Sequence, residues 1–67
     1  MTKEEIAEEI AEAIFQYSSC IEEIVKNTED FLATLAEDVQ VVVHDKVLSR
    51  SIDKEEVNKN LKELGWY

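Results

Sequence analysis

The chain has 67 residues, which is room for one domain, and a domain this short buries only about 60% of the surface that its unfolded form exposes. Hydrophobic residues make up 45% of the chain, too many for a disordered protein, and a single glycine with no proline favours helix throughout. The formal net charge is −9, and it excludes the basic stripe that direct nucleic-acid binding needs.

The number of cysteines and the lack of long apolar segments indicate where in the cell the protein is expected. Cys20 is the only cysteine, so the sequence has no internal disulfide framework. The first residues lack the basic start and apolar core of a signal peptide, and no apolar run approaches the ~20 residues that a membrane span needs. We therefore expect a cytoplasmic protein with no membrane partner.

The first predicted helix covers residues 3–26. Thr2 and Glu5 have the spacing of a capping box, and Met1 can pack against Ile6 as a hydrophobic staple. Apolar residues then recur at helical spacing in a stripe wide enough to face more than one neighbour: Ile6, Ile10, Ala13, Ile14, Tyr17, Ile21, Ile24 and Val25. The weakest segment is 17–20, where serine hydroxyls compete for backbone hydrogen bonds and a bend can form.

A second helix is predicted over residues 29–48. Asn27 or Thr28 can end the first helix and cap the second, and the apolar residues that follow keep a spacing of threes and fours. The β-branched run 39–43 could instead form a strand, but a lone strand has no partner elsewhere in the sequence. Helix is therefore the preferred interpretation of this run.

A third helix is predicted over residues 54–64. Asp53 is placed to cap it, with Glu56 completing a capping box and Ile52 packing on Val57 as a staple. Gly65 supplies the left-handed residue that ends a helix.

These elements predict an all-α fold with one domain over residues 1–67, built from two long antiparallel helices and a short C-terminal helix. A helix of ~24 residues is about 36 Å long, so the hairpin would be elongated and would leave part of its apolar stripe uncovered. We therefore predict that self-association completes the fold, and that the protein is a homo-oligomer.

Carboxylates gather at the start of the first predicted helix, at Glu4, Glu5, Glu8, Glu9 and Glu12. Their spacing places them about 6 Å apart along one side of the helix. One interpretation is a solvated face that keeps the protein soluble. The other is a phosphate mimic that occupies the basic groove of a nucleic-acid-handling protein.

The aromatic pair Trp66 and Tyr67 is the second candidate partner-binding element. It follows the third helix, and it either closes the end of the core or contacts a partner.

The sequence predicts no catalytic residue, no metal site and no cofactor. His44 is the only histidine, and it lacks the glutamate three residues earlier that a di-iron bundle needs. No segment has the alternating oxygen ligands and central glycine of a calcium loop. Cys20 is interpreted as a small core residue, because no base that could activate it is identified. We therefore expect that the protein is not an enzyme.

Two functional hypotheses remain. In size, acidity and lack of catalytic motifs the chain resembles the small inhibitors that phages and mobile elements encode, including anti-CRISPR and anti-restriction proteins, a likeness of composition. The first hypothesis is accordingly a protein inhibitor that docks its acidic helix on a basic nucleic-acid-binding site. The second is a helical structural or adaptor protein that acts through apolar self-association or binding of a partner helix. Salt separates them, because only the first mode weakens steeply with ionic strength.

Overall fold

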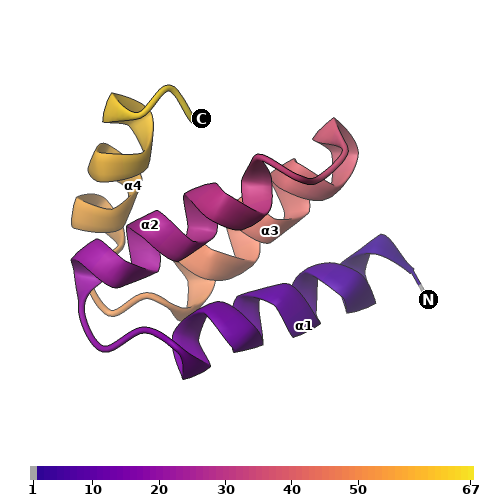
Figure 1. Cartoon of the computed structure of the whole chain (residues 1–67), viewed down its shortest axis with the longest axis horizontal. Coiled ribbons are helices and arrows are strands. Elements are labelled where there is room, and N and C mark those ends of the chain that lie inside the picture. Colours follow the sequence, from indigo (N-terminus) through magenta and orange to yellow (C-terminus); the bar gives the residue numbers. More distant parts are fainter. Residues whose placement is uncertain (1) are drawn as a thin grey trace.

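The computed structural model describes residues 2–67, and within them the chain forms four helices and no strand (Figure 1). These are α1 (Lys3–Gln16), α2 (Ile21–Leu32), α3 (Glu37–Arg50) and α4 (Lys54–Glu63). The all-α prediction is confirmed, and run 39–43 is helical. The boundaries predicted for the first two helices are wrong, because each of those helices is divided in two.

The first division falls at residues 17–20, the segment that the serines weaken. The Ser18 hydroxyl donates to the carbonyl of Ile14, and the Ser19 backbone N–H donates to Glu23 Oε1 at 2.8 Å. Cys20 is extended, with a φ of −151°, so the chain leaves α1 and re-enters a helix at Ile21. The hydroxyls and the Glu23 carboxylate thus replace the backbone hydrogen bonds that a continuous helix would make.

The residues predicted to separate the two long helices lie inside α2. Thr28 is buried and its hydroxyl donates to the carbonyl of Ile24 at 2.6 Å. Asn27 Nδ2 donates to Ser18 Oγ at 2.9 Å, which ties α2 to the segment that leaves α1. Both side chains therefore make hydrogen bonds from within α2, and neither caps a helix.

The second division falls instead at residues 33–36, between α2 and α3. The Gln40 side chain donates from Nε2 to the carbonyls of Leu32 and Leu35, at 2.7 and 3.1 Å. One α3 side chain therefore bonds the last carbonyl of α2, which also accepts from the Leu35 N–H at 3.2 Å, and a carbonyl of the connection. Ala36, the residue before α3, is extended and offers no side-chain cap.

The caps predicted at Thr2 and Asp53 are formed, but the capping box predicted for Asp53 and Glu56 is only half made. Thr2 and Glu5 make both hydrogen bonds of a capping box, and Asp53 Oδ1 accepts from the Glu56 N–H at 3.2 Å. The predicted packing of Ile52 on Val57 is wrong, because Ile52 is fully exposed. The contact predicted for Met1 lies outside the described residues.

The end of α4 is a Schellman motif built on Gly65. Gly65 has a φ of 99°, its N–H donates to the Lys62 carbonyl at 3.0 Å, and the Trp66 N–H donates to the Leu61 carbonyl at 2.9 Å. This pair of bonds turns the chain back, and it carries Trp66 onto the core.

The core is formed by alanine, valine, leucine and isoleucine side chains from all four helices. Its buried members are Ala7, Ala11, Ile14, Val25, Leu32, Val43, Val47, Val57 and Leu61. The most extensive helix contact is between α1 and α3, where alanines on α1 allow close approach, while α4 packs on α2 and α3 (Figure 1). The molecule measures 30 × 24 × 17 Å, which is not the elongated hairpin predicted from the sequence.

Candidate protein-binding surface

Three of the five predicted carboxylates share the outer face of α1. The buried residues of this helix are Ala7, Ala11 and Ile14, which face the core. Residues 5, 9 and 12 are separated by four and three residues, as residues 7, 11 and 14 are, but they lie on the opposite side of the helix. Glu5, Glu9 and Glu12 are exposed there. We call these three residues the acidic face. Glu4 is exposed as well but lies nearer the edge of α1 that faces α3.

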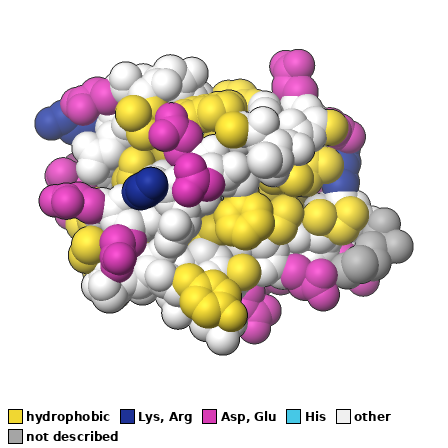
Figure 2. All heavy atoms as spheres, in the orientation of Figure 1, with side chains coloured by type: hydrophobic (Ala, Val, Ile, Leu, Met, Phe, Trp, Pro, Cys, Tyr) yellow, Lys and Arg dark blue, Asp and Glu magenta, His cyan; other side chains and the backbone are white. Residues whose placement is uncertain are grey.

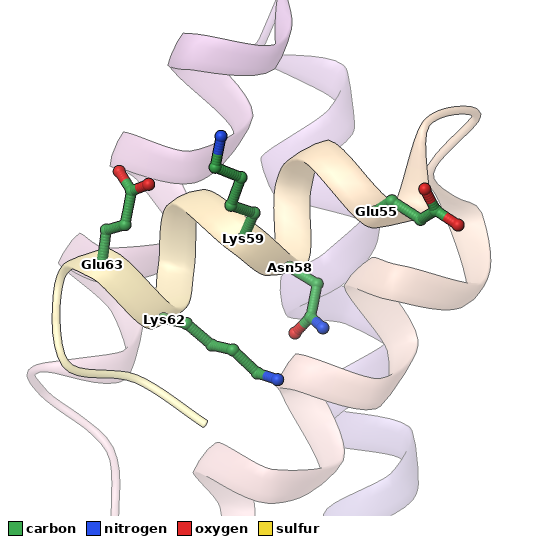
Figure 3. A pocket seen from close by; sticks show the side chains of 5 residues that line it. All are labelled: Glu55, Asn58, Lys59, Lys62 and Glu63. Atoms are coloured by element: carbon green, nitrogen blue, oxygen red, sulfur yellow. The ribbon is translucent and has the colours of Figure 1, made fainter.

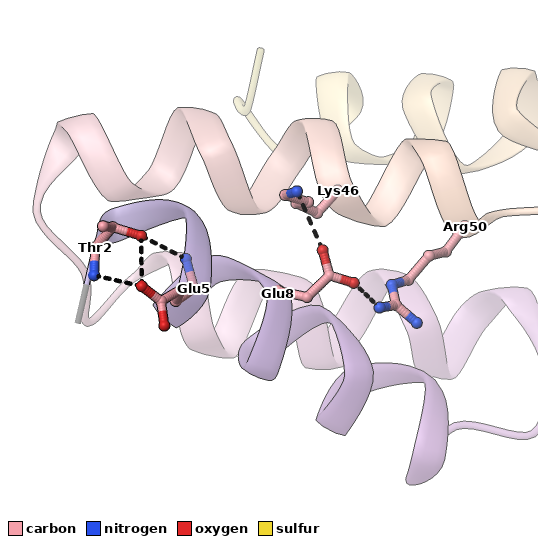
Figure 4. A network of polar contacts seen from close by, with 5 residues as sticks. All are labelled: Thr2, Glu5, Glu8, Lys46 and Arg50. Atoms are coloured by element: carbon pink, nitrogen blue, oxygen red, sulfur yellow. Dashed lines mark hydrogen bonds and ion pairs between the residues drawn. The ribbon is translucent and has the colours of Figure 1, made fainter.

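Glu8 has a different position from the other carboxylates of the cluster. Its side chain lies between Lys46 and Arg50 of α3, with Oε2 3.1 Å from Lys46 Nζ and Oε1 paired with the Arg50 guanidinium (Figure 4). Lys46 and Arg50 are four residues apart, so both project from one side of α3 toward α1. Glu8 therefore holds α1 on α3, and it is not part of the acidic face.

The capping box fixes the start of the acidic face. Thr2 N–H donates to Glu5 Oε1 at 3.3 Å, and the Glu5 N–H donates to Thr2 Oγ1 at 3.2 Å (Figure 4). The Glu5 carboxylate is held against the first turn while it stays exposed, and a carboxylate there is also favoured by the helix dipole.

The second predicted element, at the C-terminus, packs against the helices. Trp66 is half-buried and its Nε1 donates to Glu29 Oε2 at 3.2 Å. The Tyr67 hydroxyl donates to Gln40 Oε1 at 3.0 Å, and the Tyr67 side chain stays exposed. Trp66 thus closes the end of the core between α2 and α4, and a partner contact by Trp66 and Tyr67 stays a prediction.

His44 is more buried than an ordinary surface histidine. It is only 7% exposed, its ring meets the Tyr67 ring edge-on at 5.2 Å, and its Nε2 has no hydrogen-bond partner among the described residues. Burial lowers the pKa of His44, the Asp45 carboxylate 4.0 Å from Nδ1 opposes this effect, and Lys62 adds to it. The imidazole is therefore neutral at pH 7 and serves packing.

The interpretation of Cys20 as a core residue is wrong, because its side chain is exposed. It lines a pocket of about 360 Å³ between the α1–α2 and α3–α4 connections, together with Phe15, Ile24 and Val57. The pocket wall is mainly apolar. This pocket could not be predicted from the sequence, because its walls come from residues 15–24 and 50–57, which are far apart in the chain.

A second hollow, of about 420 Å³, lies along α4 and does not have the form of a reaction site. Glu55, Asn58, Lys59, Lys62 and Glu63 line it, and their side chains spread away from one another (Figure 3). Catalysis by an acid and a base needs groups that converge on one point. Among residues 2–67, no group of three or more histidine, cysteine or acidic side chains is placed to hold a metal ion.

The helices of residues 2–67 include none with the length and apolar character of a membrane span. Comparison of the chain with protein-family models, with curated proteins and with solved structures finds no match.

Proposed function

We propose that this chain is a non-catalytic inhibitor that acts in the cytoplasm by docking the acidic face of α1 on a basic nucleic-acid-binding site of another protein. The observation that carries the proposal is the orientation of Glu5, Glu9 and Glu12, which are exposed opposite the buried side of α1. Of the seven basic residues in the chain, none forms an ion pair with these three within the described residues.

Contacts with the rest of the fold hold α1 in place, and this favours its outer face as a binding surface. A row of carboxylates presents a directed field only if the helix that carries it is held in place. The capping box fixes the first turn, Glu8 pairs with two α3 cations, and the alanines pack on α3. The charges are therefore arranged before a partner arrives, which lowers the entropy cost of binding.

The test uses a fluorescent ten-residue arginine peptide as the probe for a basic site. We compare the triple variant Glu5→Gln, Glu9→Gln, Glu12→Gln with a matched control, Glu22→Gln, Glu55→Gln, Glu63→Gln. Both variants change the formal net charge from −9 to −6. Glutamine at position 5 can still accept the capping-box hydrogen bond, so α1 should stay folded.

We expect the acidic-face variant to bind the peptide at least about fivefold more weakly than the control variant at 50 mM KCl, with a shallower salt dependence. Amide chemical shifts that change on peptide addition should lie in residues 4–13. Equal losses in the two triple variants would show that the net charge, and not the acidic face, attracts the peptide. The likeness to small phage inhibitors makes nucleic-acid-handling defence enzymes the first proteins to screen as natural partners.

A second candidate function, self-association, is favoured by Ile52. This side chain is fully exposed on the α3–α4 connection and lies at the apolar pocket of about 360 Å³. A two-fold pair can place Ile52 of each copy in the pocket of the other, because the projecting residue and the hollow lie on one surface. The chain would then act as a homodimeric structural or adaptor protein.

Sedimentation equilibrium at tens of micromolar protein tests this candidate. The candidate is supported if the chain is a dimer, if Ile52→Ser dissociates this dimer, and if Leu64→Ser leaves it intact. Leu64 is the control because it is also exposed but lies away from the pocket. A single species of monomer mass would exclude self-association at these concentrations.

A further inference from the structure

The surface where α1 meets α2 combines an apolar strip with carboxylates on both sides. On α1, Glu8 faces α3, so the opposite edge, which carries Ile6, Ile10 and Tyr17, lies beside α2. On α2, Glu29 faces Trp66 at the α4 side.

The edge of α2 away from Glu29 completes this surface. It carries Ile24 and Phe31, and Asn27 on the same edge reaches Ser18 at the end of α1. We call the two edges together the α1–α2 face.

The apolar strip of this face is open to solvent. Tyr17 is 75% exposed and Phe31 is 37% exposed, while Ile6, Ile10 and Ile24 are half-buried between them. Figure 2 shows hydrophobic side chains gathered over the boundary of the two helices, with acidic side chains on either side of them. A continuous apolar strip with a charged rim is the usual composition of a protein-binding surface.

The rim is mainly acidic on both sides, although the exposed Lys26 lies beside Glu23 and Asp30 on the outer side of α2. The acidic face of α1 flanks the strip on one side, and the exposed carboxylates of Glu23 and Asp30, on the outer side of α2, flank it on the other. Hydrogen bonds from Ser19 lower the pKa of Glu23, so this carboxylate is ionised well below neutral pH. A complementary partner must therefore be apolar along its centre and basic along both edges.

We infer that the α1–α2 face binds an amphipathic helix of a partner protein, with lysine or arginine on both flanks of its apolar stripe. The inference rests on the proposed function, because it assumes that the partner is basic. It adds that the bound segment of the partner is an amphipathic helix. α1 has 14 residues and is about 21 Å long, so it matches a partner helix of about four turns. The apolar contacts give affinity, and the two acidic rims set the orientation.

Charge argues against other occupants of this face. A second copy of the chain laid across it would bring carboxylates against carboxylates, which costs binding energy. An anionic lipid surface or a nucleic-acid backbone would be repelled by the same rims. A basic helix gains from both rims at once.

The experiment compares two peptides of about 14 leucine and lysine residues with identical composition. In one the leucines fall on a single helical stripe, and in the other they are distributed around the helix. Binding is measured by fluorescence anisotropy at 150 mM KCl. The face variant is Tyr17→Ser with Phe31→Ser, and the control is Val41→Ser with Leu64→Ser, which removes two exposed apolar side chains elsewhere.

We expect the striped peptide to bind at least about tenfold more tightly than the distributed one, the face variant to lose about tenfold, and the control to stay within about twofold. Circular dichroism confirms that both variants are folded. Equal binding of the two peptides, or an unaffected face variant, overturns the inference while leaving the arginine-peptide test of the acidic face intact. A dimer dissociated by the face variant, or adsorption of the chain to phosphatidylserine vesicles through this face, also overturns it.

Discussion

Replacing Glu8 by glutamine removes the carboxylate that pairs with two cations of α3 while keeping side-chain size and helix propensity. The Glu8, Lys46 and Arg50 side chains are 44, 34 and 36% exposed, so solvent screens both ion pairs. Partly exposed pairs contribute about 0.2 to 1 kcal/mol each, which gives about 1 kcal/mol of unfolding free energy for the two. At this chain length that loss lowers Tm by about 4 to 8 °C.

The assay is urea and thermal unfolding followed by circular dichroism at 222 nm, with Glu9→Gln as the control. Glu9 is one residue away and exposed, and its replacement changes the net charge equally. We expect the control to be unchanged or slightly stabilised, because it relieves repulsion along α1. The difference between the variants should shrink in 0.5 M KCl. If Glu8→Gln is no less stable than Glu9→Gln, the α1–α3 ion pairs do not stabilise the fold.

Three further outcomes follow from burial, backbone geometry and titration. Leu32→Ala should lower the unfolding free energy by about 2 to 5 kcal/mol, measured in urea, because Leu32 is fully buried. Gly65→Ala should cost about 1 kcal/mol in the same assay through its positive φ alone, since an added Cβ meets no atom within 4 Å. Because the pKa of His44 is lower in the folded state than its ordinary 6.5, the unfolded chain binds the proton first, and stability should fall as pH drops below about 6.5. His44→Leu should flatten this part of the pH profile of Tm, and an unchanged profile would mean that His44 does not control it.

The sequence correctly predicted those helix ends that are formed by residues close together in the chain. Thr2 with Glu5, and Gly65, act within a few residues and are found as predicted, and Asp53 caps α4 although Glu56 does not complete the predicted box. The division at 33–36 has no such signal. Gln40, a residue of the next helix, donates to the carbonyls of Leu32 and Leu35 there, a contact between residues that local patterns do not connect.

The buried side of α1 could not be chosen from hydrophobicity alone. The predicted stripe was centred on isoleucines and Tyr17, whereas Ala7 and Ala11 are fully buried and Tyr17 is largely exposed. Small side chains are buried here because α3 approaches closely, and that approach is a tertiary property. The same packing takes Glu8 from the predicted carboxylate cluster and leaves the acidic face with fewer members.

The close packing of α1 on α3 limits how far the protein can be shortened. α2 separates these two helices in the sequence, so the chain must extend through Arg50 before α1 gains its main contacts and both of its ion pairs. A peptide copied from residues 2–16 would carry all the carboxylates of the acidic face, yet a lone helix of this length is marginal in water. Engineering of this surface should therefore begin from the folded chain, and a short acidic peptide is a suitable negative control.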